Sequence, residues 1–220
     1  MRRTQPNRWR MVILIGLGNP GAKYARNRHN VGFRVADAIA ARHGFGPEKQ
    51  RFQSLAREGV VETEAGPKRC LLLKPQTFYN ETGRAARAAA DFYKLGPDAI
   101  TAFHDELDLA PGKVRVKAGG GAAGNNGMRS MAATLGPDFQ RVRIGIGHPG
   151  KEKVLSHALS DFSGAEEAWL DPLLDAIARS LDLLVAGKPD AFQTRVAHLA
   201  PAPPCPDWLK RGKDGGGEAS

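Results

Sequence analysis

Hydrophobic and polar positions along the chain alternate between two spacings. Short apolar runs that end at glycine or proline are typical of buried strands, and between them apolar residues recur every three to four positions, as in helices. The runs indicate strands at 12–15, 69–74, 99–103, 113–117 and 142–146. The helical spacing covers 30–43, 81–94, 128–135 and 170–185. This order predicts a single α/β domain whose mixed, twisted β-sheet is flanked by helices.

Polar, glycine-rich segments follow the predicted strands. They occupy 16–29, 75–80, 104–108, 118–127 and 147–150. In sheets of this class, ligands bind beyond the carboxyl ends of the strands. We therefore expect these segments to converge on a functional site.

Length and composition exclude several classes of protein. A chain of 220 residues with 41% hydrophobic and 25% charged residues is typical of one globular domain. No apolar run approaches the roughly 20 residues of a membrane span, and the basic N-terminus lacks the features of a secretion signal. Two cysteines do not make a disulfide framework, so we expect a cytoplasmic protein.

The net charge of +9 indicates an anionic partner, but the charge is unevenly distributed. Residues 1–10 contain four arginines and no acid, whereas 201–220 contain three bases and three acids, which leaves +5 for 11–200. We predict a basic disordered arm over 1–10, the folded domain over 11–200 and a disordered tail over 201–220.

The first glycine motif, 16–21, matches G-x-G-x-x-G after a strand. A dinucleotide-binding fingerprint requires a helix immediately afterwards. Pro20 and the polar stretch 22–29 interrupt that helix, and Asp37, the acid at the right distance, lies inside the next helical pattern. The motif is better interpreted as a tight turn that presents Asn19. A nucleotide-binding oxidoreductase remains a weaker alternative, which an NAD titration would test.

His29 and the segment 104–108 carry the candidate catalytic groups. An aspartate such as Asp105 that accepts from one imidazole nitrogen leaves the other nitrogen to act as a general base near neutral pH. No serine or cysteine lies in a nucleophile-like context, so a hydrolase of this sequence would activate water. A metal site built from His104, Asp105, Asp108 and His148 is disfavoured, because their spacing matches no zinc pattern.

Asparagines and basic residues complete the candidate site. Asn19, Asn80, Asn125 and Asn126 fall on strand-end segments, where amides can hold a peptide or an oxyanion, although Asn80 is also a natural helix N-cap. The glycine-rich loop 119–127 leads into a helix, and a helix start favours an anion. The bases near this loop are Arg115, Lys117, Arg129, Arg141 and Arg143. Together they indicate a phosphate site, although each base singly is more simply a solvated surface charge.

Several of these segments occur in the order seen in bacterial-type peptidyl-tRNA hydrolases, which the chain resembles from about 12 to 199. The matching segments are GLGNPGAKYARNRHNVG, KPQTFYNETG, HDELDL, the glycine loop ending in NNG, and RIGIGHPG. The resemblance implies an esterase that separates a peptide from the tRNA 3′ ribose and recycles tRNA from aborted translation. It also implies one α/β domain around a mixed sheet, no metal or cofactor, and a monomer.

The resemblance also assigns roles to individual residues. His29 corresponds to the catalytic base and Asp105 to the acid that orients it. Three asparagines correspond to residues that position peptide and water: Asn19, Asn80 and Asn126. Tyr24 corresponds to a contact with the tRNA acceptor end, and Lys117 and Arg143 to a clamp on the tRNA 5′-phosphate. In this interpretation the basic arm serves nonspecific RNA binding more than catalysis.

The chain departs from the family pattern at two positions. Tyr79 stands where members commonly have methionine, and we expect it to narrow the peptide site or add a polar tip to it. Asn125 stands where many members have histidine, and it cannot become cationic. The main alternative is a relative of the same family that binds RNA without hydrolysis, although His29 and Asp105 are both present.

Overall fold

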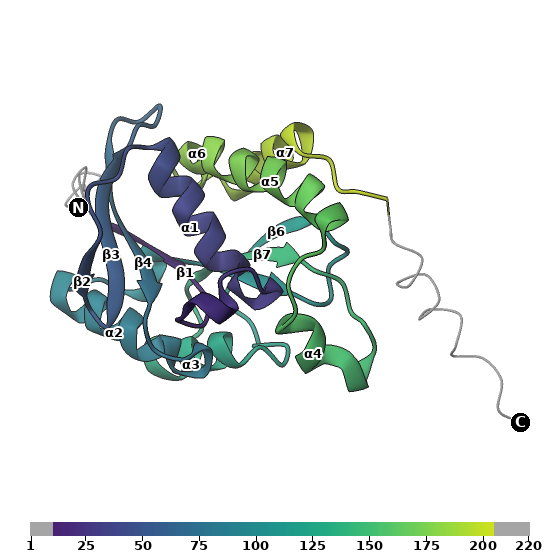
Figure 1. Cartoon of the computed structure of the whole chain (residues 1–220). Coiled ribbons are helices and arrows are strands. Elements are labelled where there is room, and N and C mark those ends of the chain that lie inside the picture. Colours follow the sequence, from purple (N-terminus) through teal and green to yellow (C-terminus); the bar gives the residue numbers. More distant parts are fainter. Residues whose placement is uncertain (1–10, 205–220) are drawn as a thin grey trace, which may run out of the picture.

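A seven-stranded sheet runs through the middle of the molecule, for which a computed structural model describes residues 11–204 (Figure 1). Its strands are β1 (Val12–Gly16), β2 (Lys49–Arg51), β3 (Ser54–Val61), β4 (Lys68–Pro75), β5 (Ile100–Glu106), β6 (Val114–Ala118) and β7 (Gln140–Gly145). The predicted arm at 1–10 and residues 205–220 of the predicted tail lie outside the described residues.

The order of strands across the sheet is β2-β3-β4-β1-β5-β7-β6. The four inner strands, β4, β1, β5 and β7, are parallel to one another. Antiparallel pairing occurs only towards the two margins of the sheet, in β2–β3, β3–β4 and β6–β7. The sheet is therefore mixed, as the sequence predicts, and the carboxyl ends of its inner strands meet at one edge.

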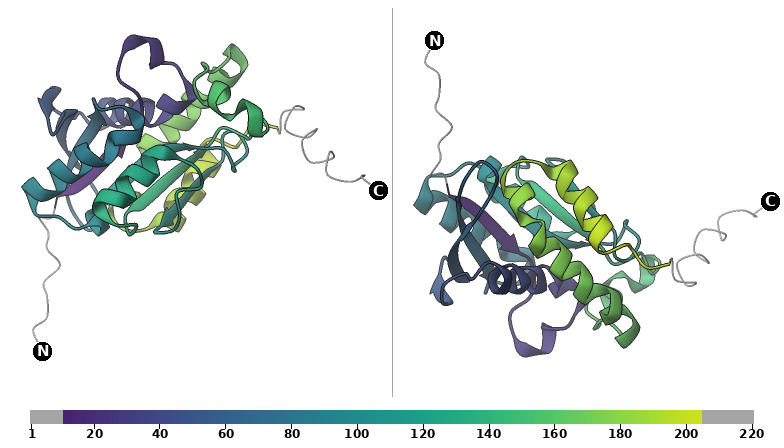
Figure 2. Two further views of the ribbon diagram at one scale, coloured as in Figure 1. Left: turned by 90° about the horizontal axis from the view of Figure 1, so that it is seen from below. Right: turned by 90° about the horizontal axis from the view of Figure 1, so that it is seen from above.

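Helices cover both faces of this sheet (Figures 1 and 2). On one face lie α1 (Val31–Arg42), α5 (Gly164–Arg179), α6 (Leu181–Val185) and α7 (Pro189–Leu199), and on the other α2 (Thr82–Tyr93) and α3 (Asn126–Leu135). Strand β1 serves both cores, because Leu14 packs on the first face while Ile13 and Ile15 pack on the second. Burial on both faces explains why the inner strands are continuous apolar runs in the sequence.

The glycine motif after β1 has a packing role. A Cβ atom at Gly16 would lie 2.2 Å from the carbonyl oxygen of Gly32, so only glycine lets α1 pack this closely on β1. Helix α1 begins at Val31, after two 3₁₀ turns (Ala22–Tyr24 and Arg28–Asn30). The segment therefore lacks the helix that a dinucleotide-binding turn needs directly after its glycines.

The structure corrects several predicted boundaries. Strand β5 continues to Glu106, because its ladder with β7 pairs His104 with Arg143 and Asp105 with Ile144. The predicted helix at 170–185 begins earlier, at the capping box of Ser163 and Glu166, and is divided at Ser180 into α5 and α6. The hairpin of β2 and β3, the short helix α4 (Val154–Ala158) and helix α7 were not predicted. No helix within 11–204 is long and apolar enough to cross a membrane.

Candidate active site

Several of the predicted site residues come together at the edge where the inner strands end, whereas Lys117 on antiparallel β6 pairs with Arg141 near the start of β7. The loop after β1 carries Asn19 and His29, a 3₁₀ turn (Tyr79–Glu81) follows β4, and Asp105 lies near the end of β5. Because these strands are parallel neighbours, residues that are far apart in the sequence meet here. The site occupies the position that strand topology predicts for a ligand.

His29 and Asp105 form the central pair. The Nδ1 atom of His29 lies 2.9 Å from Oδ2 of Asp105. The Asp105 side chain is only 4% exposed, whereas that of His29 is 19% exposed. Burial by itself raises the pKa of Asp105, but His29 and the Tyr79 hydroxyl outweigh it and hold the pKa below its usual value. An ionised Asp105 accepts a hydrogen bond from Nδ1–H of His29, so Nε2 of His29 keeps its lone pair.

Tyr79 lies beneath this pair. Its ring stacks on the imidazole of His29, with centroids 3.5 Å apart and planes 17° apart. Its hydroxyl donates to Oδ1 of Asp105 at 2.7 Å and accepts from Nδ2 of Asn125 at 3.0 Å. Burial and the Asp105 charge raise the pKa of Tyr79 well above its usual value, so the hydroxyl stays protonated. The sequence predicts a polar tip in the peptide site, but this hydroxyl is buried inside the protein.

Asn19 is held by a second asparagine that the sequence analysis missed. The side chain of buried Asn30 accepts from the Asn19 N–H at 3.0 Å and donates to the Asn19 carbonyl at 2.9 Å. The Asn19 side-chain oxygen accepts from the backbone N–H of Tyr79 at 3.0 Å. This orientation leaves Nδ2 of Asn19 as the donor of its amide. Asn30 follows His29 directly, but nothing in its sequence context marks its partner.

The other asparagines differ in their positions. Asn80 is exposed in the 3₁₀ turn before α2, and the residue that caps α2 is Glu81, so the N-cap interpretation of Asn80 is wrong. Asn125 is the N-cap of a different helix, α3, where its Oδ1 accepts from the Met128 N–H at 3.0 Å. Asn126 is exposed in the first turn of α3.

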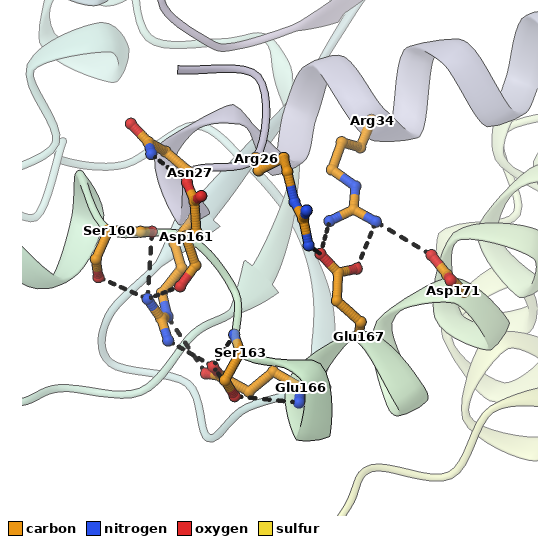
Figure 3. Close-up of polar contacts among 10 residues, drawn as sticks. Arg26, Asn27, Arg34, Ser160, Asp161, Ser163, Glu166, Glu167 and Asp171 are labelled. Carbon is orange, nitrogen blue, oxygen red and sulfur yellow. Dashed lines mark hydrogen bonds and ion pairs between the residues drawn. The ribbon is translucent and has the colours of Figure 1, made fainter. Parts of the chain in front are cut away.

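A polar network ties the loop that carries His29 to α5 and the segment before it (Figure 3). Arg28 is buried, and its guanidinium donates to both carboxylate oxygens of Glu166 and to Ser160 and Asp161. Asn27 donates to Asp161 at 2.7 Å. These contacts were not predicted, because a basic residue in a loop carries no sign of a partner more than 130 positions away.

The bases near the glycine loop are not equivalent. Arg141 is buried, donates to the carbonyls of Gly120 and Gly121 at 2.8 and 2.6 Å, and thereby shapes the loop. Arg143 donates through Nε to Oε2 of Glu106 at 2.8 Å and is 24% exposed. Lys117 is exposed on β6. Of the three, Lys117 and Arg143 are therefore the ones that a phosphate can reach.

Tyr24, the predicted acceptor-end contact, lies in the loop before His29. It is half-buried, and the ammonium group of Lys23 lies 4.7 Å from its ring centroid.

Three of the residues considered for a metal site, His104, Asp105 and His148, have other partners. His104 is buried in β5, and its Nδ1–H donates to the Asp105 carbonyl at 2.7 Å. The Nδ1 atom of His148 accepts from the Gly150 N–H at 3.1 Å. Over residues 11–204, no three His, Cys, Asp or Glu side chains gather as a metal-binding group.

Two cavities lie near the site. One of about 270 Å³ reaches Asn19, and its walls include Phe33, Arg34, Asp37 and Gln76. A larger one of about 890 Å³ is lined by Arg28, His157 and Trp169 among others, on the side of the loop held by α5. His29 and Asp105 line neither cavity, so the catalytic pair is located by its hydrogen bonds and not by the larger of these two cavities.

Comparison with known proteins gives a consistent result. The sequence profile of the family described as peptidyl-tRNA hydrolase matches residues 13–202. The peptidyl-tRNA hydrolase of Maricaulis maris is 60% identical over 205 residues, which cover 93% of this chain and 99% of that protein. That of Hyphomonas neptunium is 57% identical, covering 88% and 94%. The crystal structure of the Acinetobacter baumannii peptidyl-tRNA hydrolase superposes with a TM-score of 0.79 at 37% identity, covering 90% and 100%.

Proposed function

The chain belongs to the peptidyl-tRNA hydrolase family and hydrolyses peptidyl-tRNA, and from this premise we propose how its residues carry out the reaction. His29 acts as the general base, and Asp105 orients it. The observation that carries this proposal is the 2.9 Å contact between Nδ1 of His29 and Oδ2 of Asp105, next to a partly exposed imidazole. A base of this kind contributes about 10²–10⁴-fold to the rate.

The reaction begins with water. Nε2 of His29 takes a proton from a water molecule as its oxygen attacks the ester carbonyl that joins the peptide to the 3′ ribose. The tetrahedral intermediate collapses, the carbon–oxygen bond to the ribose breaks, and the leaving ribose oxygen takes the proton back from His29. No covalent enzyme intermediate forms, and His29 returns to its starting state.

Amide side chains stabilise the negative charge that develops during attack. Asn19 is suited to this role because Asn30 and the Tyr79 N–H hold it with Nδ2 available as a donor. Removing one such donor typically costs about 3 kcal/mol of transition-state stabilisation. Exposed Asn80 and Asn126 hold the peptide and water, and the cavity beside Asn19 receives the peptide.

The tRNA part of the substrate binds across the site. Tyr24 contacts the acceptor end, Asn125 contributes to substrate binding, and Lys117 and Arg143 bind the 5′-phosphate. The exposure of Lys117 and the partial exposure of Arg143 support this assignment. Phosphate binding of this kind makes the affinity for tRNA depend on salt. We further propose that the protein acts as a cytoplasmic monomer without a metal or cofactor.

The test compares the wild type with His29→Ala on an N-blocked aminoacyl-tRNA. We expect the rate of ester cleavage to fall by about 10²-fold or more. The control is His198→Ala, which removes an exposed histidine on α7 and leaves the rate unchanged. Full activity of His29→Ala would refute the mechanism. Wild-type protein that binds tRNA without turnover would instead support the alternative of RNA binding alone.

A further inference from the structure

Tyr79 contacts four of the residues to which the proposed function assigns a role, namely His29, Asp105, Asn19 and Asn125. We propose that Tyr79 is a positioning residue of the hydrolytic site, which holds His29 and Asp105 in their working geometry, and that Asn125 sets the direction of its hydroxyl. This inference rests on the proposed function, because it concerns the same pair of residues. Each contact is a separate constraint on that pair.

The first constraint is the stacked ring. The imidazole of His29 lies flat on the Tyr79 ring at a centroid distance of 3.5 Å, so it cannot tilt toward the interior. The tyrosine ring is itself wedged in place. A Cβ atom at Gly127 would lie 2.5 Å from Cε1 of Tyr79, so only glycine at the start of α3 leaves room for the ring.

The second constraint is a hydrogen-bond chain with one possible direction. Oδ1 of Asn125 accepts from the Met128 N–H, so its Nδ2 must face the Tyr79 hydroxyl. Since the hydroxyl accepts from this amide, its only proton points to Oδ1 of Asp105. The other carboxylate oxygen, Oδ2, faces His29. Both oxygens of Asp105 are thus assigned to different donors, and the carboxylate plane cannot rotate without breaking one bond.

The third constraint links the pair to Asn19. The backbone N–H of Tyr79 donates to the side-chain oxygen of Asn19 at 3.0 Å. One residue therefore sets the orientation of the base, its acid and the amide proposed to stabilise the oxyanion. Tyr79 and Asn125 are also the two positions where the sequence departs from the family pattern, and the structure joins them by a hydrogen bond.

The contacts predict which kinetic constant depends on the Tyr79 hydroxyl. Tyr79 is 4% exposed and its hydroxyl is buried, so substrate does not touch it. The charged or titratable groups around Asp105 are His29, Tyr79, His104, Glu106 and His157. Among the described residues, a variant without the hydroxyl leaves His29 as the side chain that donates to Asp105. The charge on the carboxylate is then shared with fewer donors, so it stabilises the protonated imidazole more strongly. The protonated imidazole, which cannot take a proton from water, then persists to a higher pH than in the wild type.

The experiment uses Tyr79→Phe, which keeps the ring and removes the hydroxyl. We expect kcat for an N-blocked aminoacyl-tRNA to fall about tenfold with KM changed less than about twofold. We expect the acidic limb of the kcat/KM profile to move up by about 0.5 pH unit. The matched control is Tyr93→Phe, which removes a phenol hydroxyl that donates to Glu58 at the surface and leaves both readouts unchanged.

Three outcomes would overturn the inference. The first is a folded Tyr79→Phe protein with the kcat and the pH profile of the wild type. The second is a raised KM with a normal kcat. The third is a lower kcat with the acidic limb of the pH profile unmoved. The second would make Tyr79 a substrate contact, and the third would give it a merely structural role. A Tyr79→Phe variant with normal kinetics, alongside an inactive His29→Ala, would reject this inference while leaving the proposed function intact.

A second variant covers a failure of Tyr79→Phe to fold. Asn125→Ser keeps an oxygen to cap α3 but has no N–H₂ to direct the Tyr79 hydroxyl. We expect a smaller fall in kcat, about threefold, with the acidic limb moved in the same direction. An unmoved acidic limb in this variant would overturn the role given to Asn125, and with it the proposal.

Discussion

Arg28 and Glu166 face each other across 138 positions of sequence, with guanidinium nitrogens 3.3 and 2.5 Å from the two carboxylate oxygens. The contact joins the residue before His29 to the first turn of α5. Glu166 also accepts from the Ser163 N–H at 2.8 Å in the capping box of that helix. One carboxylate therefore stabilises the start of a helix and the loop that carries the proposed base.

Arg28→Met should destabilise the protein and slow catalysis. Burial raises the pKa of Glu166, but Arg28 and Ser163 outweigh burial and hold it below its usual value. Without Arg28, this mostly buried carboxylate loses its ionic partner, and we expect a loss of about 2–3 kcal/mol in the free energy of unfolding. Urea denaturation measures this loss, and steady-state kinetics measures the accompanying fall in kcat.

The matched control is Arg26→Met. The Arg26 side chain is 69% exposed, and it lies 3.8 Å from Glu167. An exposed ion pair contributes little, so we expect a change below about 0.5 kcal/mol. Equal stabilities of the two variants would show that the Arg28 network does not hold the loop.

Asp105→Asn should nearly abolish turnover. The substitution keeps the size of the side chain but removes the charge that favours Nδ1–H of His29, so the imidazole can adopt the tautomer with no lone pair on Nε2. We expect kcat to fall about 10³-fold or more, as for the corresponding change in Ser-His-Asp enzymes. Single-turnover cleavage of an N-blocked aminoacyl-tRNA gives the rate. Asp108→Asn, at an exposed position two residues beyond β5, should leave it unchanged, and comparable losses in the two variants would contradict the role of Asp105.

Lys117→Met should weaken tRNA binding without affecting stability. The side chain is exposed on an edge strand, and its proposed partner is a phosphate. We expect KM to rise about tenfold, and the dependence of log KM on log salt to lose about one unit of slope. Lys49→Met, on β2 at the opposite edge of the sheet, serves as the control. An unchanged salt slope in Lys117→Met would exclude a phosphate contact.

Arg143→Met should raise KM in the same way but also destabilise the fold. Arg143 is paired with Glu106, whose side chain is 8% exposed, so the substitution leaves a buried carboxylate without this partner. We expect a loss of about 1–3 kcal/mol in the free energy of unfolding. Urea denaturation of the Lys117 and Arg143 variants side by side tests the difference, and identical stabilities would argue against the pairing.

His104 should make stability fall with acidification. Burial lowers its pKa from the usual value and outweighs the opposing effect of Asp105. A histidine whose pKa is lower when folded stabilises the fold fully above about pH 6.5, and this contribution is lost as the pH falls below that value. His157 acts in the same direction, because burial lowers its pKa as well.

We therefore expect the free energy of unfolding to decrease between pH 6.5 and 5.0, by at most about 1.4 kcal/mol per pH unit for each histidine. His104→Gln should make this decrease shallower, whereas His198→Gln, at an exposed position, should not. Urea denaturation over this pH range gives both slopes, and a His104→Gln slope equal to that of the wild type would contradict the prediction.

The sheet was predictable because its inner strands are buried on both faces. Continuous apolar runs, such as the one around Leu14, identify such strands without knowledge of their neighbours. The hairpin of β2 and β3 was missed because its polar, partly exposed residues lack that signal. The end of β5 was also misplaced. His104, Asp105 and Glu106 are polar residues within a strand. The burial of Asp105 and Glu106 depends on partners from other elements, while His104 donates to the Asp105 carbonyl in the same strand.

The sequence alone was sufficient to identify the family, the class of reaction and the candidate residues His29, Asp105, Asn19 and Asn80, because motif order and residue chemistry are local properties. It also singled out Tyr79 and Asn125 as departures from the family pattern, but it did not reveal that they touch. The tertiary structure decided that Tyr79 lies beneath His29, that Asn30 holds Asn19 and that Arg141 is buried while Arg143 is within reach of solvent. The physical reason is that parallel strands bring distant segments to one edge, and the direction of each hydrogen bond depends on partners that the chain order does not specify.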